Sequence, residues 1–111
     1  MSTSPEFLQY ILDMLAPVGY VQTSRMFSGV LLKVERKQLG VMLGEVLYFK
    51  VIDAELQEQY KKKGSVQFSY TRKDKKDPVI IKNWWSVPES AMDNEEEIVT
   101  LAREVLAQEE L

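Results

Sequence analysis

Residues 98–106 carry the strongest helical periodicity in the chain. Apolar side chains recur there at i, i+3, i+4, i+7 and i+8, and they are Ile98, Leu101, Ala102, Val105 and Leu106. Asp93 and Glu96 have capping-box spacing, which predicts that the helix begins beside Asp93. Because a helix with one apolar stripe must bury it, the rest of the chain has to supply a matching surface.

Strand-like patterns supply that surface. Short β-branched and apolar runs separated by turn residues predict an antiparallel meander, and a second hairpin follows in which Val66, Phe68 and Tyr70 alternate with polar residues. The predicted strands are 26–35, 39–43, 46–51, 66–71 and 78–85. The predicted turns lie at 35–37, 44–45 and 74–77.

Two further helices complete the prediction. Ser4 and Pro5 begin an amphipathic helix that ends at Pro17, and Asp53 caps a short polar helix that runs to about Lys63, before Gly64. The order is therefore α-β-β-β-α-β-β-α. This order predicts a single α+β domain over residues 1–111, with an antiparallel sheet of about five strands that helices cover on at least one face.

Composition excludes most catalytic chemistry. The chain has no cysteine and no histidine, so it lacks thiolate nucleophiles, an imidazole base and the usual metal ligands. Gly40 and Gly44 lie between strands and cannot form a phosphate loop, and consecutive carboxylates at 95–97 point in different directions from a helix. We expect no enzyme, cofactor or metal site.

The first residues and the hydropathy of the chain indicate where in the cell the protein is expected. The first residues show no basic stretch followed by a continuous apolar run, and no run approaches the roughly 18 apolar residues of a spanning helix. These features predict a cytoplasmic protein with no membrane contact.

Charge divides the chain into unlike segments. Residues 61–88 carry a net charge of +6, and residues 89–111 carry −7. The basic residues are Lys61, Lys62, Lys63, Arg72, Lys73, Lys75, Lys76 and Lys82. They make one phosphate-binding patch if the end of the second helix lies near the turn after 71, which is a DNA-binding hypothesis. The alternative is ordinary solvated lysine at a helix end and a hairpin tip.

Trp84 and Trp85 are adjacent in a predicted strand, so their side chains must leave on opposite faces. Strict alternation places Val79, Ile81, Asn83 and Trp85 on one face, with Trp84 and Lys82 on the other. Trp84 could stack on a base, anchor a protein interface, or be core beneath a second helix. Tyr48, Phe49, Phe68 and Tyr70 are interpreted as structural.

Several short segments, in order, carry a family resemblance. They are residues 15–17 (LAP), 25–29 (RMFSG), 46–51 (VLYFKV) followed by Asp53, 68–70 (FSY), 85–89 (WSVPE) and the closing helix. Together they resemble the amino-terminal domain of the TfoX/Sxy competence regulators over nearly the whole chain. Ser28 stands where that pattern has a second glycine, and the 111 residues match the first domain alone.

The resemblance implies a fold, a role and partners. The implied fold is the α+β arrangement also found in YjbR-like proteins and secretion chaperones. The implied role is that of a non-enzymatic bacterial regulator of DNA uptake and transformation, in which longer relatives help a cyclic-AMP-responsive activator at competence promoters. It implies a protein partner or a homo-oligomer, and it marks Arg25, Met26, Phe27 and Gly29 as the most recognisable motif, with a conformational or interface role.

Overall fold

The computed structural model describes residues 4–26, 28–71, 74 and 76–108. Its elements in chain order are α1 (Pro5–Leu15), η1 (Ala16–Val18), β1 (Gln22–Met26), β2 (Gly29–Val34), β3 (Lys37–Leu43), β4 (Val46–Lys50), α2 (Ala54–Lys62), β5 (Gln67–Thr71), β6 (Pro78–Ser86), η2 (Glu89–Ala91) and α3 (Glu95–Leu106). The predicted α+β class is confirmed.

One antiparallel sheet contains all six strands, in the order β1-β2-β3-β4-β6-β5. The sheet has one strand more than the sequence predicts, because β1 lies almost entirely before the run predicted as 26–35, and that run corresponds to β2. The predicted turn at 35–37 is shorter than expected. Glu35 and Arg36 alone have positive φ, and Lys37 already belongs to β3.

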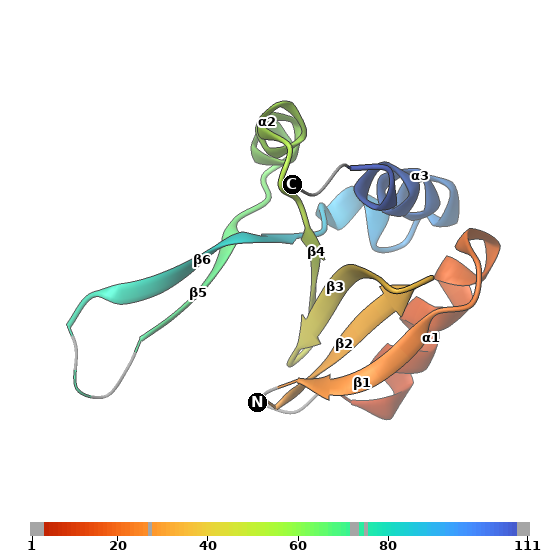
Figure 1. Ribbon diagram of the computed structural model, residues 1–111, viewed down its shortest axis with the longest axis horizontal. Helices are drawn as coiled ribbons and strands as arrows, with labels where there is room; N and C mark the ends of the chain where they lie inside the picture. The colour runs from red at the N-terminus through yellow and green to blue at the C-terminus, as the bar shows by residue number, and fades with distance from the viewer. Residues whose placement is uncertain (1–3, 27, 72–73, 75, 109–111) are drawn as a thin grey trace.

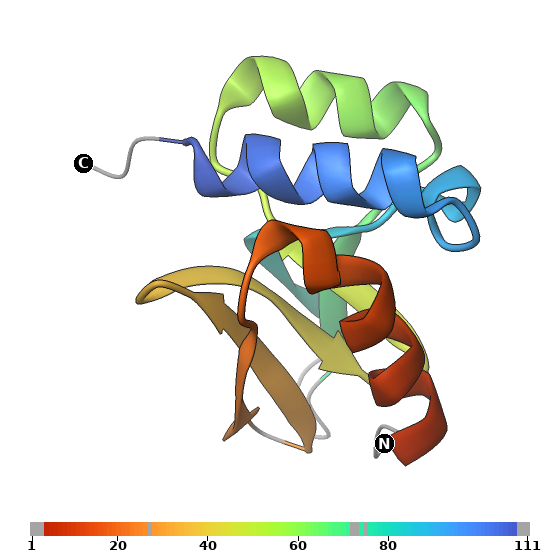
Figure 2. The same cartoon turned by 90° about the vertical axis from the view of Figure 1, so that its right-hand side faces the viewer.

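The helices lie on one side of the sheet (Figures 1 and 2). Ile11 and Leu15 of α1, Leu56 and Tyr60 of α2, and the stripe of α3 share one core with the strand side chains that point toward them. The strands contribute Leu32, Val34, Leu39, Met42, Leu47, Phe49 and Trp85 to that core, and Val51, just after β4, joins them. We call the opposite side of the sheet the outer face, and no helix of the described residues lies on it.

Caps fix where the helices begin. The Ser4 hydroxyl accepts a hydrogen bond from the Phe7 amide at 3.2 Å, and an Asp53 carboxylate oxygen accepts one from the Leu56 amide at 2.9 Å, as predicted. The predicted cap at Asp93 is wrong by one residue. Asn94 caps α3 instead, since its side chain accepts from the Glu97 amide at 3.1 Å.

The β5–β6 hairpin leaves the body of the domain as an arm (Figure 1), which we define as residues 67–81. Gln67 pairs with Trp85, but the next residue, Phe68, pairs with Ile81, so Lys82, Asn83 and Trp84 have no partner on β5. This irregularity overturns the alternation predicted for β6, because Trp85 points into the core while Ile81 lies on the outer face with Phe68.

Tyr60 is fully buried in the core, and its hydroxyl has no hydrogen-bond partner among the described residues. Burial raises the pKa of this hydroxyl well above its ordinary value, and the nearby Glu104 carboxylate raises it further. Above a pH of about 10, the unfolded chain therefore releases this proton while the folded chain keeps it, and the free energy of unfolding falls by about 1.4 kcal/mol per pH unit.

We expect Tyr60→Phe to flatten this alkaline loss and to raise stability near neutral pH by about 1 kcal/mol, because it removes an unsatisfied buried hydroxyl. Urea unfolding between pH 7 and 11 measures both effects. Tyr20→Phe is the matched control, since Tyr20 is 80% exposed. A Tyr60→Phe protein that keeps the wild-type alkaline slope would contradict the explanation.

Candidate functional site

The outer face of the sheet is largely apolar. Cross-strand partners share a face, so the pairing register and the core contacts together assign each strand residue to one side. The apolar outer residues are Leu31, Val41, Leu43, Val46, Tyr48, Phe68, Tyr70, Val79, Ile81 and Trp84. Leu31 and Val41 are buried yet lie outside the helix-side core, so the outer face has a small apolar layer of its own.

Three aromatic rings form a row across this face. The rings of Tyr48 and Phe68 meet edge-to-face with centroids 5.2 Å apart, and those of Phe68 and Tyr70 are stacked at 6.1 Å. Partial burial in the row raises the pKa of the Tyr48 hydroxyl. Tyr70, at the outer end, remains 39% exposed. The row joins the body to the arm, and its neighbours Val79, Ile81 and Trp84 are half-buried.

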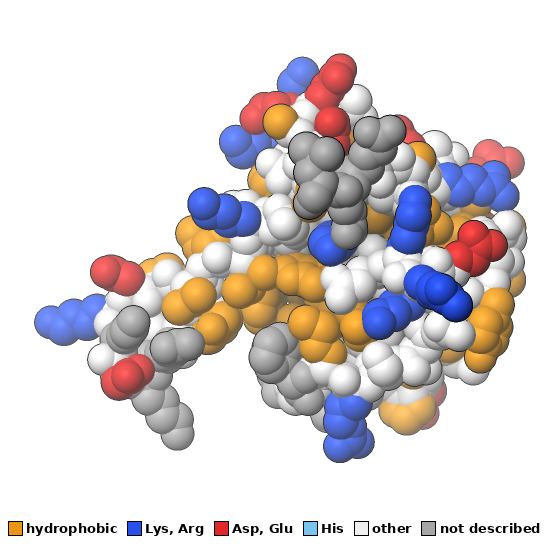
Figure 3. Space-filling view, viewed as in Figure 1, with side chains coloured by type: hydrophobic (Ala, Val, Ile, Leu, Met, Phe, Trp, Pro, Cys, Tyr) orange, Lys and Arg blue, Asp and Glu red, His pale blue; other side chains and the backbone are white. Residues whose placement is uncertain are grey.

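Figure 3 shows hydrophobic side chains gathered in the angle between the arm and the body. Among the described positions of the outer face that pair across strands, the charged residues are Lys33 and Lys50. Lys33 pairs with Gln22 and Gln38, and Lys50 donates a hydrogen bond to the Gln38 side chain at 3.2 Å. The apolar surface therefore ends at two lysines, and Glu35 lies in the adjoining β2–β3 turn.

The tryptophan pair divides as predicted. Trp85 lies opposite Phe49 in the core, and Trp84 lies opposite Lys50 on the outer face. Trp84 is half-buried and does not belong to the helix-side core, so the interpretation of both rings as core is wrong. Lys82 is exposed, and its carbonyl accepts a hydrogen bond from the Gln67 side chain at 2.8 Å.

The described basic residues of this segment do not form one cluster. Lys61, Lys62 and Lys63 lie at the carboxyl end of α2, near the base of the arm, whereas Lys76 lies near its tip. β5 alone separates the two groups by about 17 Å, at the usual rise of a strand. Arg72, Lys73 and Lys75 lie outside the described residues. No ion pair joins a described residue of 61–88 to a described residue of 89–108. Lys61 instead forms an ion pair with Glu58 of the same helix, at 3.5 Å.

The family motif forms the β1–β2 connection. Arg25 is exposed and Met26 half-buried at the end of β1, and buried Gly29 begins β2; Phe27 lies outside the described residues. A β-carbon on Gly29 would overlap the Met42 carbonyl oxygen and lie 2.6 Å from the Leu43 side chain. Gly29 therefore has a packing role next to the outer face.

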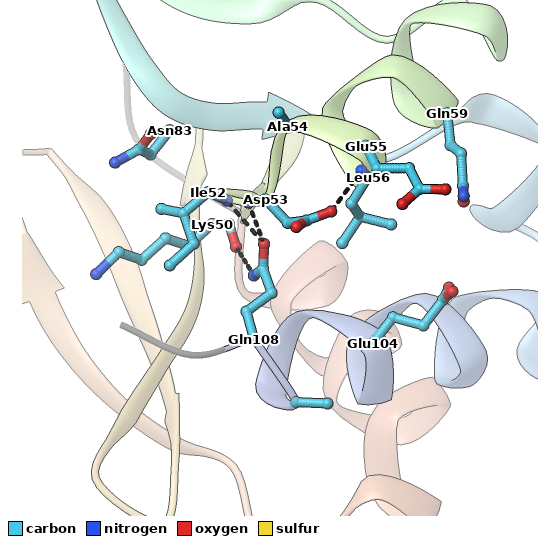
Figure 4. Close-up of a pocket in the computed structure, with 11 residues that line it drawn as sticks. Lys50, Ile52, Asp53, Ala54, Glu55, Leu56, Gln59, Asn83, Glu104 and Gln108 are labelled. Atoms are coloured by element: carbon cyan, nitrogen blue, oxygen red, sulfur yellow. Dashed lines mark hydrogen bonds between the residues drawn. The ribbon is translucent and has the colours of Figure 1, made fainter. Parts of the chain in front are cut away.

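A groove of about 1130 Å³ lies between α2 and the end of α3 (Figure 4). The side-chain amide of Gln108 forms part of its wall. The amide oxygen accepts hydrogen bonds from the backbone N–H groups of Ile52 and Asp53 at 2.8 and 2.9 Å. The amide nitrogen donates to the carbonyls of Lys50 and Val105 at 2.8 and 3.0 Å. The part of the groove's wall around Gln108 is thus built from groups that bond one another, which favours a structural role for this residue.

We expect Gln108→Ala to lower the free energy of unfolding by about 2 kcal/mol, because it leaves two amides and a carbonyl without partners. Amide exchange at Ile52 and Asp53 should accelerate with it. Gln9→Ala is the control, since it removes one exposed hydrogen bond to Asp13 and should cost less than about 0.5 kcal/mol. Equal losses in the two variants would argue against the role given to Gln108.

Neither a membrane span nor a metal cluster is found in the described part of the chain. No helix there is long and apolar enough to cross a bilayer. No group of three or more acidic side chains is placed to hold a metal ion among residues 4–26, 28–71, 74 and 76–108.

Sequence reasoning missed the aromatic row as a candidate surface. Tyr48, Phe68 and Tyr70 were interpreted as structural because such residues commonly pack on sheets. The alternation of Phe68 and Tyr70 with Ser69 did indicate one apolar face of a strand. It could not indicate that this face lies opposite the helices.

The family comparison agrees with this structure. The model of the TfoX N-terminal domain matches residues 13–109, which include every strand, all of α2 and α3 and the end of α1. A search of curated proteins finds no match. The chain belongs to the TfoX N-terminal domain family.

Proposed function

We propose that the domain is a non-enzymatic regulator of transcription in DNA-uptake competence, and that it acts by binding a protein through its outer face. The observation that carries the proposal is the apolar, aromatic side of the sheet that no helix covers. Exposed apolar surfaces of this kind mark interaction sites in folded proteins, and aromatic residues supply much of the binding energy there.

The family supports the regulatory part of the proposal. A TfoX N-terminal domain is a regulatory domain, and the resemblance of the sequence points to a cyclic-AMP-responsive transcription activator as the protein it assists. The chain's lack of histidine and cysteine is in keeping with binding rather than catalysis.

The test is a titration of the labelled domain with a purified cyclic-AMP-responsive activator, followed by fluorescence anisotropy with and without cyclic AMP. Saturable binding is expected, and Tyr70→Ala should weaken it, whereas Tyr20→Ala should leave it unchanged. Both tyrosines are exposed, but Tyr20 lies before β1, away from the aromatic row. No association under either condition would count against the proposal.

A second candidate function is direct DNA binding through the arm. The observation that favours it is that the arm projects from the body as a two-stranded ribbon, a shape that can enter a DNA groove. Lys76 and Lys82 lie on this hairpin, and Arg72, Lys73 and Lys75 belong to the same segment of sequence. Asp74 and Asp77 reduce the positive charge near the tip.

Salt dependence distinguishes this candidate. A labelled generic duplex is titrated at about 50 and 200 mM salt, and DNA binding through several lysines should weaken steeply between the two. Gln replacements at Lys61, Lys62, Lys63, Lys73, Lys75 and Lys76 should flatten that slope. Lys33→Gln with Lys37→Gln is the control, because both lie outside the basic segment. Absence of binding at low salt would eliminate the DNA candidate.

A further inference from the structure

We propose that β5 is a dimerisation edge, and that it pairs antiparallel with β5 of a second copy of the chain about a two-fold axis through Ser69. The pairing would join the sheets of the two copies into one continuous sheet. It concerns the edge of the sheet and is independent of the activator proposed above. Two features of β5 support it, which are its open edge and its self-complementary sequence.

The edge of β5 is open. β5 is the last strand in the sheet order, and among the described residues it pairs with β6 alone. The backbone N–H and C=O groups on its other side therefore face no strand of this part of the chain. The arm carries this edge away from the three helices (Figure 1). The irregularity adds residues 82–84 to β6 and none to β5, so the free edge itself is regular.

The sequence of β5 lacks the features that keep an edge strand unpaired. Such strands commonly carry a lysine or a proline, which opposes pairing with another chain. Residues 65–71 (SVQFSYT) contain no charged residue and no proline. Ser69, Tyr70 and Thr71 are exposed. A second strand can therefore reach this edge without meeting a charge on β5.

The opposite edge of the sheet, β1, offers less to a second copy. Its exposed residues are polar, and Arg25 is charged. A two-fold axis through its middle residue, Ser24, would pair Thr23 with Arg25 and would place no two apolar side chains opposite each other. Pairing there would gain backbone hydrogen bonds but little apolar burial. The structure therefore favours β5 as the pairing edge.

The five residues of β5 are complementary to themselves. Opposite residues of an antiparallel pair share a face, so a two-fold axis between identical strands passes through a residue that pairs with its own copy. An axis through Ser69 gives every β5 residue a partner. Phe68 lies opposite the second copy's Tyr70, and Gln67 lies opposite the second copy's Thr71. An axis through Phe68 or Tyr70 would leave two residues of the strand unpaired.

This register extends the apolar pairs of each arm across the axis. Phe68 pairs with Ile81 and Tyr70 pairs with Val79 within one arm. The dimer would therefore contain a row of Ile81, Phe68 and the second copy's Tyr70 and Val79, together with the same row generated by symmetry. Every member of both rows is apolar or aromatic, and cross-strand pairs of this kind stabilise a sheet. This match identifies the occupant of the edge as a second copy.

The charges that flank β5 set the salt dependence of the dimer. Antiparallel pairing brings the start of each strand near the end of the other. The sequence around both ends is rich in cations, which Asp74 and Asp77 offset in part; the cations are Lys61, Lys62, Lys63, Arg72, Lys73, Lys75 and Lys76. Salt screens repulsion between them. We therefore expect the dimer to be several-fold tighter at about 500 mM than at about 50 mM salt, the reverse of DNA binding.

Sedimentation velocity of the whole protein tests the pairing. Between about 5 and 500 µM the wild type should pass from monomer to dimer, because one pair of strands makes a small interface of low affinity. Ser69→Lys places two like charges opposite each other at the axis and should weaken the dimer at least about tenfold. Ser24→Lys is the matched control, since Ser24 is the exposed middle residue of β1 and should leave the dimer unchanged. Circular dichroism checks that each variant is folded.

A charge exchange at the axis tests the register. Ser69→Lys and Ser69→Glu should each remain monomeric, whereas an equimolar mixture should form a heterodimer because opposite charges then face each other. Native mass spectrometry distinguishes the heterodimer from either homodimer by mass. A variant that merely disorders the arm would not regain a dimer on mixing, so recovery is specific to the proposed pairing.

The contrary outcomes are equally defined. A wild-type protein that stays monomeric at about 500 µM would overturn the inference. So would a dimer that survives Ser69→Lys, a dimer that Ser24→Lys dissociates, or a mixture of the two Ser69 variants that forms no heterodimer. A dimer that weakens as salt rises would also contradict the pairing, because the cations at its ends repel one another.

The proposed function fails by a different result. If the wild type dimerises through β5 and the activator does not bind, the dimer stands and the proposed function falls. If the protein is monomeric and the activator binds through Tyr70, the proposed function stands and the dimer is wrong. Titration of the activator with the Ser69→Lys protein measures its binding to the monomer directly.

Discussion

Replacement of Gly29 by alanine is expected to lower the free energy of unfolding by about 3 kcal/mol or more, enough to unfold much of a small domain. The added β-carbon would overlap the carbonyl oxygen of Met42 on the neighbouring strand. Backbone of a central strand cannot retreat as a flexible side chain does. β2 and β3 would therefore have to separate where they pair between Val30 and Met42.

Urea unfolding of the variant measures this loss, and Gly64→Ala is its control. Gly64 has a φ of +91°, and no atom lies within 4 Å of the position that a β-carbon would take, so alanine there meets backbone strain alone and should cost about 1 kcal/mol. A Gly29→Ala protein no less stable than Gly64→Ala would contradict the packing argument. The comparison decides whether Gly29 of the family motif is needed for the close packing of β2 against β3.

Excision of the arm beyond its first pair is expected to abolish partner binding while leaving the domain folded. Residues 69–80 can be replaced by Asn-Gly, because Phe68 and Ile81 are directly paired and a two-residue turn joins such a pair in a hairpin. No described residue of 69–80 belongs to the core, so we expect a change of less than about 1 kcal/mol in the free energy of unfolding.

The affinity for the activator, in contrast, should fall by at least about tenfold, because the excision removes Tyr70 and one side of the apolar angle. Urea unfolding and activator anisotropy on the same preparation separate the two effects. Tyr70→Ala, which keeps the arm, should show an intermediate loss. A shortened protein that binds the activator as well as wild type would locate the interaction away from the arm.

The helices and the fold class follow from the sequence because their signals are local. The stripe of α3 and the caps Ser4 and Asp53 depend on residues within one or two turns of the helix. β1 lacks such a signal. Its residues, Gln22–Met26, are almost all exposed at the edge of the sheet, so no apolar alternation marks it as a strand.

The candidate site was less predictable, for a physical reason. Alternation along a strand tells which side chains share a face, but not which face the helices cover. The irregularity in β6 adds a second obstacle, since it depends on how Gln67 and Phe68 pair with distant residues. Trp84 and Trp85 were separated correctly because they are adjacent, whereas Ile81 was misplaced because it lies beyond the irregularity.

The break in pairing opposite residues 82–84 also divides the sheet into two cooperative units. Adjacent pairs of a ladder support one another, and on the β5 side that support is interrupted between Gln67 and Phe68. Because the core includes none of the residues of 69–80 that the structure describes, the hairpin can open locally while the body stays folded. The lifetime of the apolar angle is therefore set by the hairpin alone, and a substitution that stabilises the body does not prolong it.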